Sequence, residues 1–144
     1  MPRVRLEGSV RVALAPADAL GLFTPSGERL WAAGWNPRFP AAAEDETAPG
    51  TVFTTDHDDV TTTWIVVARD RERSITYSNV SEAGRASLIR VSCEPGPDGT
   101  TSATVSYDIT ALNESGAAWL HEFAAGYPQY LEHWEHAIAA ALAR

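Results

Sequence analysis

The sequence has few positive charges, and none of them is a lysine. Its 11 basic residues are all arginines and face 19 acidic residues, which gives a formal net charge of −8. The arginines are scattered, and the only cluster, at Arg69, Arg71 and Arg73, is typical of a polar turn between strands. Nucleic-acid binding requires clustered cations at the phosphates. The composition therefore argues against a nucleic-acid partner.

Cysteine is equally scarce. Cys93 is the only one, which excludes an intrachain disulfide and a cysteine-based zinc cluster. Its alternating apolar surroundings are typical of a small buried side chain. No apolar run reaches the roughly 20 residues of a membrane-spanning helix, and residues 1–5 lack the apolar segment of a signal peptide. We therefore expect a cytoplasmic protein without a membrane span.

The length of 144 residues is that of one domain, and we expect a single domain over residues 1–144. Hydrophobic residues make up 44% of the chain and charged residues 21%, which are ordinary values for a folded protein. No internal repeat is evident. We expect this domain to exist as a monomer or a homodimer.

Residues 113–144 are predicted to form one long amphipathic helix, with Asn113 as its N-cap. At about 100° per residue, one stripe collects apolar and aromatic side chains, and the opposite face is polar. The stripe consists of Gly116, Leu120, Phe123, Tyr127, Tyr130, Trp134, Ile138 and Ala141. Pro128 cannot donate a hydrogen bond to the carbonyl of Ala124, so we expect a kink or local break beside it.

Alternation of apolar and polar residues predicts six strands. They span residues 3–14, 51–55, 61–69, 74–80, 86–94 and 100–110. Short polar turns join the last five, which predicts an antiparallel meander because parallel strands need longer crossovers. The inner face of the last strand is expected to carry Ala103, Val105, Tyr107 and Ile109.

Two short helices are predicted after the first strand. Pro16 begins one that continues to about Phe23, and Ser26 is the expected N-cap of a second, over residues 27–33, which Gly34 would end. Residues 36–50 contain three prolines and show no periodicity, so we expect a loop there.

This order of elements resembles the START-like helix-grip superfamily, also called SRPBCC, which includes polyketide cyclase/dehydrase-like proteins. Residues 30–35 (Leu-Trp-Ala-Ala-Gly-Trp), 50–53 (Gly-Thr-Val-Phe) and 61–67 (Thr-Thr-Thr-Trp-Ile-Val-Val) are also similar to that family. The resemblance implies an α+β helix-grip fold. In this fold a curved antiparallel sheet of about six strands wraps around a long C-terminal helix, and a cavity lies between them.

The resemblance also implies different roles for the two halves of the last helix. Its C-terminal end would pack against the two short helices, which places Trp134, Ile138 and Leu142 in the core with Leu20, Phe23 and Leu30. Its middle, around Phe123, Tyr127 and Tyr130, would face the cavity.

The candidate ligand-binding residues are aromatic and are expected to face this cavity. They are Trp31, Trp35, Phe53, Trp64, Tyr77, Tyr107, Phe123, Tyr127 and Tyr130. Tyrosine hydroxyls in a cavity can orient a ligand carbonyl or phenol, or act as general acids. As core residues they would instead bond to the backbone. No inward carboxylate or histidine is evident beside them, and we assign no catalytic residue.

Histidines occur at two positions where a metal site could be considered, but the surrounding sequence favours a metal at neither. His133 and His136 are near one helical turn apart, with Glu132 beside them, but Glu132 and His136 lie opposite the aromatic stripe. His57 lies in an acidic hairpin turn whose spacing fits no calcium loop. We therefore expect neither a metal nor a cofactor.

The sequence thus favours a protein that binds an apolar or aromatic small molecule, lipid-like or polyketide-like, under its C-terminal helix. A first alternative is an enzyme of the cyclase or aromatase type, in which polar wall residues promote aldol closure and dehydration of a poly-ketone chain. A second is a partner-binding regulator that resembles chaperone-activator domains, for which an exposed apolar groove would be expected.

Overall fold

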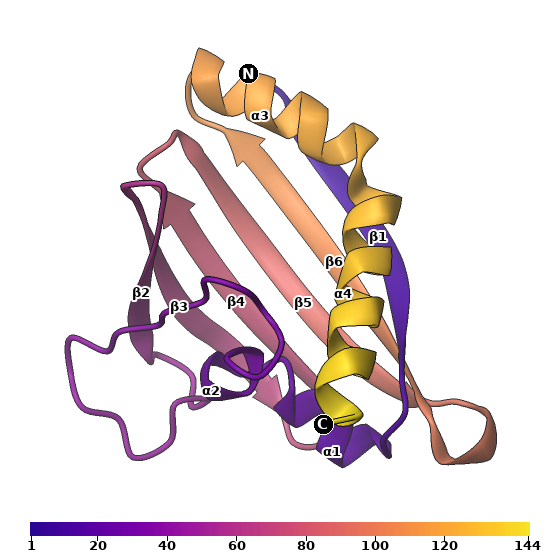
Figure 1. Ribbon diagram of the computed structural model, residues 1–144. Coiled ribbons are helices and arrows are strands. Elements are labelled where there is room, and N and C mark those ends of the chain that lie inside the picture. The colour runs from indigo at the N-terminus through magenta and orange to yellow at the C-terminus, as the bar shows by residue number, and fades with distance from the viewer.

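The computed structural model describes residues 1–144 as one open sheet with helices along one face (Figure 1). The strands are β1 (Arg3–Val12), β2 (Val52–His57), β3 (Val60–Asp70), β4 (Ser74–Ser81), β5 (Arg85–Pro95) and β6 (Thr101–Ala111). The helices are α1 (Pro16–Gly21), α2 (Pro25–Glu28), α3 (Glu114–Ala125) and α4 (Tyr127–Leu142), and a short 3-10 turn, Pro97–Gly99, precedes β6. The predicted α+β class and the six-stranded sheet are confirmed.

The sheet has the strand order β1-β6-β5-β4-β3-β2, and all neighbours are antiparallel. β2 to β6 form the predicted meander, and β1 pairs with the last strand. One register shift, between Val66 and Ala68, interrupts the β3–β4 ladder. Such a bulge bends the strand and increases its twist. The sheet curves toward the side on which α3 and α4 lie (Figure 1).

The alternation in the sequence identifies the inner face of the sheet correctly. Val105 and Ile109 of β6 are fully buried, as are Ile75 of β4 and Val66 of β3. Trp64 shares the inner face with Val66 and is half-buried. The inner face therefore supplies both the core and one wall of the space under the helices.

The C-terminal segment is two helices rather than one. α3 ends at Ala125 and α4 begins at Tyr127, with Gly126 between them outside helical geometry (φ −97°, ψ 7°). Pro128 lies in the first turn of α4. Backbone N–H groups in this turn have no acceptor within the helix, so a proline here removes no helical hydrogen bond. The predicted break is confirmed, and Asn113 is the N-cap, because its side chain accepts a hydrogen bond from Gly116 N at 2.8 Å.

The second short helix differs from the prediction. Thr24, not Ser26, is the N-cap of α2, and its hydroxyl accepts from Gly27 N at 3.1 Å. Pro25 starts the helix because its ring fixes a helical φ angle. The helix then ends at Glu28, and the expected continuation to residue 33 forms turns. Tryptophan side chains in those turns bind backbone carbonyls, and these tertiary contacts outweigh local helix propensity.

The C-terminal end of α4 makes only some of the contacts that were expected with the two short helices and the turns beside them. Ile138, Leu20 and Phe23 are each 1% exposed and belong to the core, as predicted. Leu30 and Leu142 are 61% and 37% exposed, so their expected place in the core is wrong. Leu142 is the last residue of α4, and Leu30 lies in the turns after α2, so neither side chain has an element packed over it. None of the helices combines the length and apolar character required to cross a membrane.

Candidate functional site

A cavity of about 490 Å³ lies between the inner face of the sheet and helices α3 and α4. The segment that begins with α2 closes one end, strands β2 to β6 form the floor, and α3 and α4 form the opposite wall. This volume is within the range of small-molecule sites, roughly 300–1,000 Å³. The cavity lies where the sequence predicted one.

Six of the nine predicted ligand-binding residues line this cavity: Trp31, Trp35, Trp64, Tyr107, Phe123 and Tyr130. Five of them form two groups. Trp35 contacts Trp64 edge to face, with 5.6 Å between ring centroids, on the β2–β3 side. Tyr107, Phe123 and Tyr130 contact one another on the helix side, at 5.0 to 6.4 Å. A ligand between these groups would lie between two aromatic walls.

The other three predicted residues, Phe53, Tyr77 and Tyr127, belong to the core and do not line the cavity. Phe53 is stacked against Trp64 at 5.6 Å. The Tyr77 hydroxyl donates to the Phe23 carbonyl at 2.8 Å, and the Tyr127 hydroxyl donates to the Val105 carbonyl at 2.7 Å. Burial raises the pKa of both phenols. These two hydroxyls therefore have backbone partners and no free direction toward a ligand.

Indole N–H groups fix the tryptophans of the wall. Trp31 donates to the Leu22 carbonyl and Trp35 to the Pro25 carbonyl, both at 2.8 Å, which ties the turns after α2 back to the helices before them. Trp64 donates to the Thr55 hydroxyl at 3.0 Å. With their N–H groups bonded to the protein, these three rings offer mainly apolar surface to the cavity.

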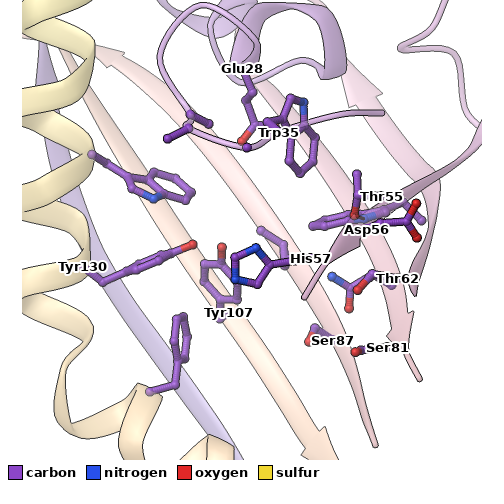
Figure 2. A pocket seen from close by; sticks show the side chains of 18 of the residues that line it. Glu28, Trp35, Thr55, Asp56, His57, Thr62, Ser81, Ser87, Tyr107 and Tyr130 are labelled. Carbon is purple, nitrogen blue, oxygen red and sulfur yellow. Dashed lines mark hydrogen bonds between the residues drawn. The ribbon is translucent and has the colours of Figure 1, made fainter. Parts of the chain in front are cut away.

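Glu28, the last residue of α2, is a carboxylate group that the sequence analysis missed. Its side chain lines the cavity and extends toward it in Figure 2. It takes part in none of the ion pairs of the chain, and burial raises its pKa well above the usual range. The sequence does contain a signal for this position, because Glu28 precedes Trp31 by three residues. In a helical turn this spacing places both side chains on the same face. The expectation that no carboxylate points inward is therefore wrong.

Tyr107 and Tyr130 direct their hydroxyls toward each other in the cavity (Figure 2). Burial raises the pKa of both phenols, most strongly at Tyr107. Both hydroxyls belong to residues that line the cavity, so each can form a hydrogen bond with a ligand.

The floor of the cavity carries a strip of small polar side chains. Ser81 and Asn79 of β4 are 3% and 9% exposed, and Ser87 of β5 lies beside them (Figure 2). The alternation that places Ile75 and Tyr77 inward on β4 extends to Asn79 and Ser81, so this strip was predictable from the strand period. These groups can bind the polar edge of an otherwise apolar ligand.

One arginine lines the end of the cavity next to α3. Arg85 is the first residue of β5, and its guanidinium carbon lies 3.6 Å from the ring centroid of Trp119. The rim also includes two exposed histidines, His57 and His133. His136 and Glu132 are exposed and do not line the cavity, and no cluster of His, Cys, Asp and Glu suited to a metal is present.

No protein-family model and no curated protein matches this sequence. Solved structures match nearly the whole chain. A START superfamily protein from Mycobacterium smegmatis has 13% identity and a TM-score of 0.68 over 94% of this chain and 97% of its own. Norcoclaurine synthase from Thalictrum flavum has 10% identity and the same TM-score over 99% and 88%. CalU16 from Micromonospora echinospora has 16% identity and a TM-score of 0.64 over 100% and 90%.

At these identities the likeness concerns the fold, and it extends over the complete element order. The matches cover 94–100% of this chain, which includes the six-stranded antiparallel sheet and the C-terminal helices that lie across it. The chain therefore has the START-like helix-grip fold, also called the SRPBCC fold.

Proposed function

We propose that the protein binds an apolar or aromatic small molecule in the cavity between the sheet and helices α3 and α4. The supporting observation is the cavity itself, about 490 Å³ of space with aromatic rings on two sides. Protein interiors are normally close-packed, with few voids larger than a water molecule. Space of this size, lined largely by aromatic rings, favours an organic occupant.

The orientation of the lining favours a small molecule over a protein partner. The aromatic side chains of α3 and α4 point toward the sheet, and Tyr107 and Ile89 point back from it. A partner protein would require this apolar surface on the outside of the molecule. Binding of a small molecule therefore remains the preferred proposal over a chaperone-activator role.

Thermal unfolding with a panel of apolar and aromatic compounds tests the proposal. A ligand at 100 times its Kd stabilises the folded protein by about 2.7 kcal/mol, which is a measurable increase in Tm. Native mass spectrometry of freshly purified protein would identify a retained ligand directly. If no compound in a broad panel raised the Tm and no ligand were retained, the proposal would be rejected.

A matched pair of variants tests whether the ligand binds in this cavity. Ser87 lies on the inner face of β5 and lines the cavity, whereas Ser92 lies on the outer face of the same strand. Ser87→Phe fills part of the cavity and is expected to weaken binding of the compounds that raise the Tm. Ser92→Phe adds the same ring outside and should leave binding unchanged. Equal effects of both variants would argue against this cavity as the site.

The cyclase alternative gains support from one specific observation. Glu28, Tyr107 and Tyr130 all line the same cavity, and burial raises the pKa of all three, which favours their protonated forms. In an aldol closure the attacked carbonyl oxygen takes up a proton, and such groups can donate it. One of the matched structures is named as a synthase, so this fold accommodates catalysis.

Tyrosine-to-phenylalanine variants separate a carrier from an enzyme. In a carrier, Tyr107→Phe and Tyr130→Phe weaken binding by about 0.5–1.5 kcal/mol each, and no variant forms product from a poly-β-ketone chain. Tyr77→Phe and Tyr127→Phe are controls, because their hydroxyls bond to the backbone. These two should lower stability and leave affinity unchanged. Product formed by the wild type and lost in Tyr130→Phe would favour the cyclase.

A further inference from the structure

Arg85 is the only arginine among the residues that line the cavity, and one of its faces is covered by an aromatic ring. Its guanidinium carbon lies 3.6 Å from the centroid of Trp119, and Trp119 is stacked on Phe123 at 4.6 Å with an interplanar angle of 14°. A guanidinium stacks on an aromatic ring by its face and donates hydrogen bonds in its own plane. The stack therefore holds Arg85 in place and leaves its edge available.

No group of the chain uses that edge. Arg85 takes part in none of the ion pairs. The arginines whose side chains donate hydrogen bonds are Arg3, Arg5, Arg29, Arg69 and Arg144. Burial lowers the pKa of Arg85, yet a guanidinium stays charged in proteins. The cavity thus contains a half-buried positive charge without a counter-charge.

The other ionisable residues of the lining do not neutralise it. Asp56 pairs with Arg38, and His57 and His133 are exposed at the rim. Glu28 belongs to α2, which lies toward the opposite end of the sheet from α3 in Figure 1. Its raised pKa also favours the neutral acid. The charge of Arg85 is therefore uncompensated within the cavity.

We propose that the ligand of this cavity is an aromatic carboxylate whose carboxylate group binds the edge of Arg85. The guanidinium fork matches the two oxygens of a carboxylate, and such charge-assisted pairs are stronger than neutral hydrogen bonds. The aromatic body of the ligand then lies against Phe123 and Tyr130, and its far end reaches the polar strip or Glu28. This inference rests on the proposed function of the cavity as a small-molecule site.

The expected preference for an anionic ligand over a neutral one arises from the contact with Arg85. The chain as a whole has a net charge of −8, so its long-range field repels anions and cannot concentrate them at the cavity. A preference for an anionic ligand must therefore arise from a contact in the site, and removing that one contact should abolish the preference.

Two ligands of the same shape test this directly: naphthalene-2-carboxylate and the uncharged naphthalene-2-carboxamide. Isothermal titration calorimetry at constant pH gives the Kd of each for the wild type, Arg85→Gln, Arg85→Lys and Arg90→Gln. Arg90 is an exposed arginine on the outer face of the same strand, so Arg90→Gln removes the same charge away from the cavity. Circular dichroism and Tm establish that each variant is folded.

We expect the wild type and Arg90→Gln to bind the carboxylate about tenfold or more tightly than the amide. Arg85→Gln should lose this preference by weakening the carboxylate alone, and Arg85→Lys should restore part of it. Equal affinities of the wild type for both ligands, or equal weakening of both by Arg85→Gln, would overturn the inference and leave the cavity as a ligand site. Binding of neither compound would overturn the inference and count against the proposed function itself.

Discussion

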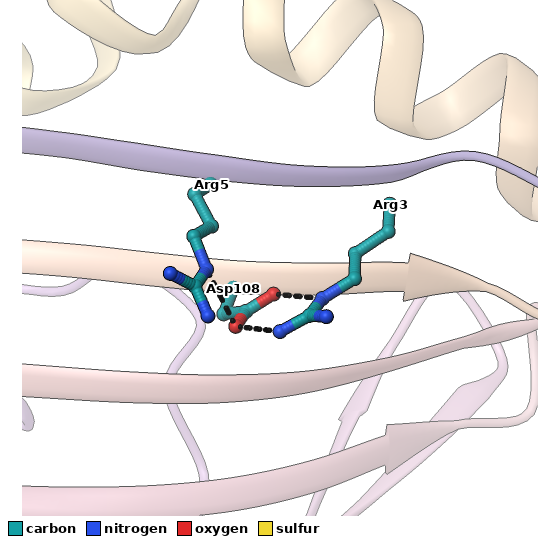
Figure 3. A network of polar contacts seen from close by, with 3 residues as sticks. All are labelled: Arg3, Arg5 and Asp108. Atoms are coloured by element: carbon teal, nitrogen blue, oxygen red, sulfur yellow. Dashed lines mark hydrogen bonds and ion pairs between the residues drawn. The ribbon is translucent and has the colours of Figure 1, made fainter.

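Arg3 and Asp108 join the first strand to the last through two hydrogen bonds, of 2.9 and 2.7 Å, on the outer face of the sheet (Figure 3). Arg5, directly opposite Asp108 in the ladder, adds a third at 3.2 Å. The hydrogen bonds from Arg3, with the charges of both arginines, lower the pKa of Asp108 to about 2. The edge strand β1 is thus attached by side chains as well as by its backbone ladder.

The Asp108 contacts predict a pH-dependent contribution to stability. A folded-state pKa of about 2, below the unfolded value of about 3.9, means that the contribution is present above about pH 4. It is lost as the pH falls toward 2. Asp108→Asn should therefore destabilise the protein at pH 7, and its difference from the wild type should shrink toward pH 2 in urea unfolding. Asp98→Asn, which removes an exposed carboxylate without an ion pair, should show no such trend.

Tyr127 lies in the core and not in the cavity that the resemblance implied for it, whereas Trp134 contacts Phe23, as expected, and also lines the cavity. Tyr127 is 4% exposed and bonded to Val105, and Trp134 is half-buried. We therefore expect Tyr127→Ala to cost about 3–5 kcal/mol of unfolding free energy, as large core truncations do. Trp134→Ala enlarges an existing cavity, so it should cost less and weaken ligand binding more. Urea unfolding and ligand titration of both variants would contradict this if the order were reversed.

The difference between Tyr127 and Trp134 shows that helical periodicity does not predict how deeply a side chain is buried. Tyr127 and Trp134 are seven residues apart, so they fall on the same stripe at 100° per residue and the pattern cannot distinguish them. How deeply each of the two side chains is buried depends on the part of the structure that faces it. Tyr127 packs over β1 beside Gly8, and its hydroxyl reaches the carbonyl of Val105, which is opposite Gly8 in the ladder of β1 and β6. Trp134 lies two turns further along, over the space beside α2.

The sheet was predictable because strand alternation is a local signal, whereas the charged residues of the site depend on contacts distant in sequence. Arg85 was expected in a turn and is the first residue of β5. Its place in the cavity depends on Trp119, more than 30 residues later. Glu28 faces the cavity because α2 ends there, and that end is set by tertiary bonds of Trp31 and Trp35.

Gly116 is expected to be intolerant of any side chain. An added Cβ would overlap the carbonyl oxygen of Gly84 and lie 2.8 Å from its carbonyl carbon, in the turn between β4 and β5. Backbone cannot move aside as a side chain can, so Gly116→Ala should lower the unfolding free energy by about 1–3 kcal/mol. Gly21→Ala, with nothing within 4 Å of the added Cβ, is the control and should be tolerated. A Gly116→Ala protein as stable as the wild type would contradict the close approach of α3 to this turn.

Cys93 should be unreactive in the folded protein. Its side chain is 1% exposed, and burial raises the pKa of the thiol to about 11, so thiolate is scarce at pH 8. A thiol reagent such as Ellman's reagent should leave the native protein unmodified over minutes and label it fully in urea. Rapid labelling of the native protein would show that this part of the sheet opens frequently.

The pairing of β1 with β6 also determines when the chain can complete its sheet during synthesis. Arg3 is opposite Thr110, so this end of β1 has no partner until more than 100 further residues have been made. At about 5–20 residues per second, this delay is on the order of 5–20 s. Pairing across such a long separation is also slow, because the loop must close before its contacts form. During that interval β1 is an unpaired strand, and Arg3, Arg5, Glu7 and Arg11 place charges on its polar face that discourage pairing with other nascent chains.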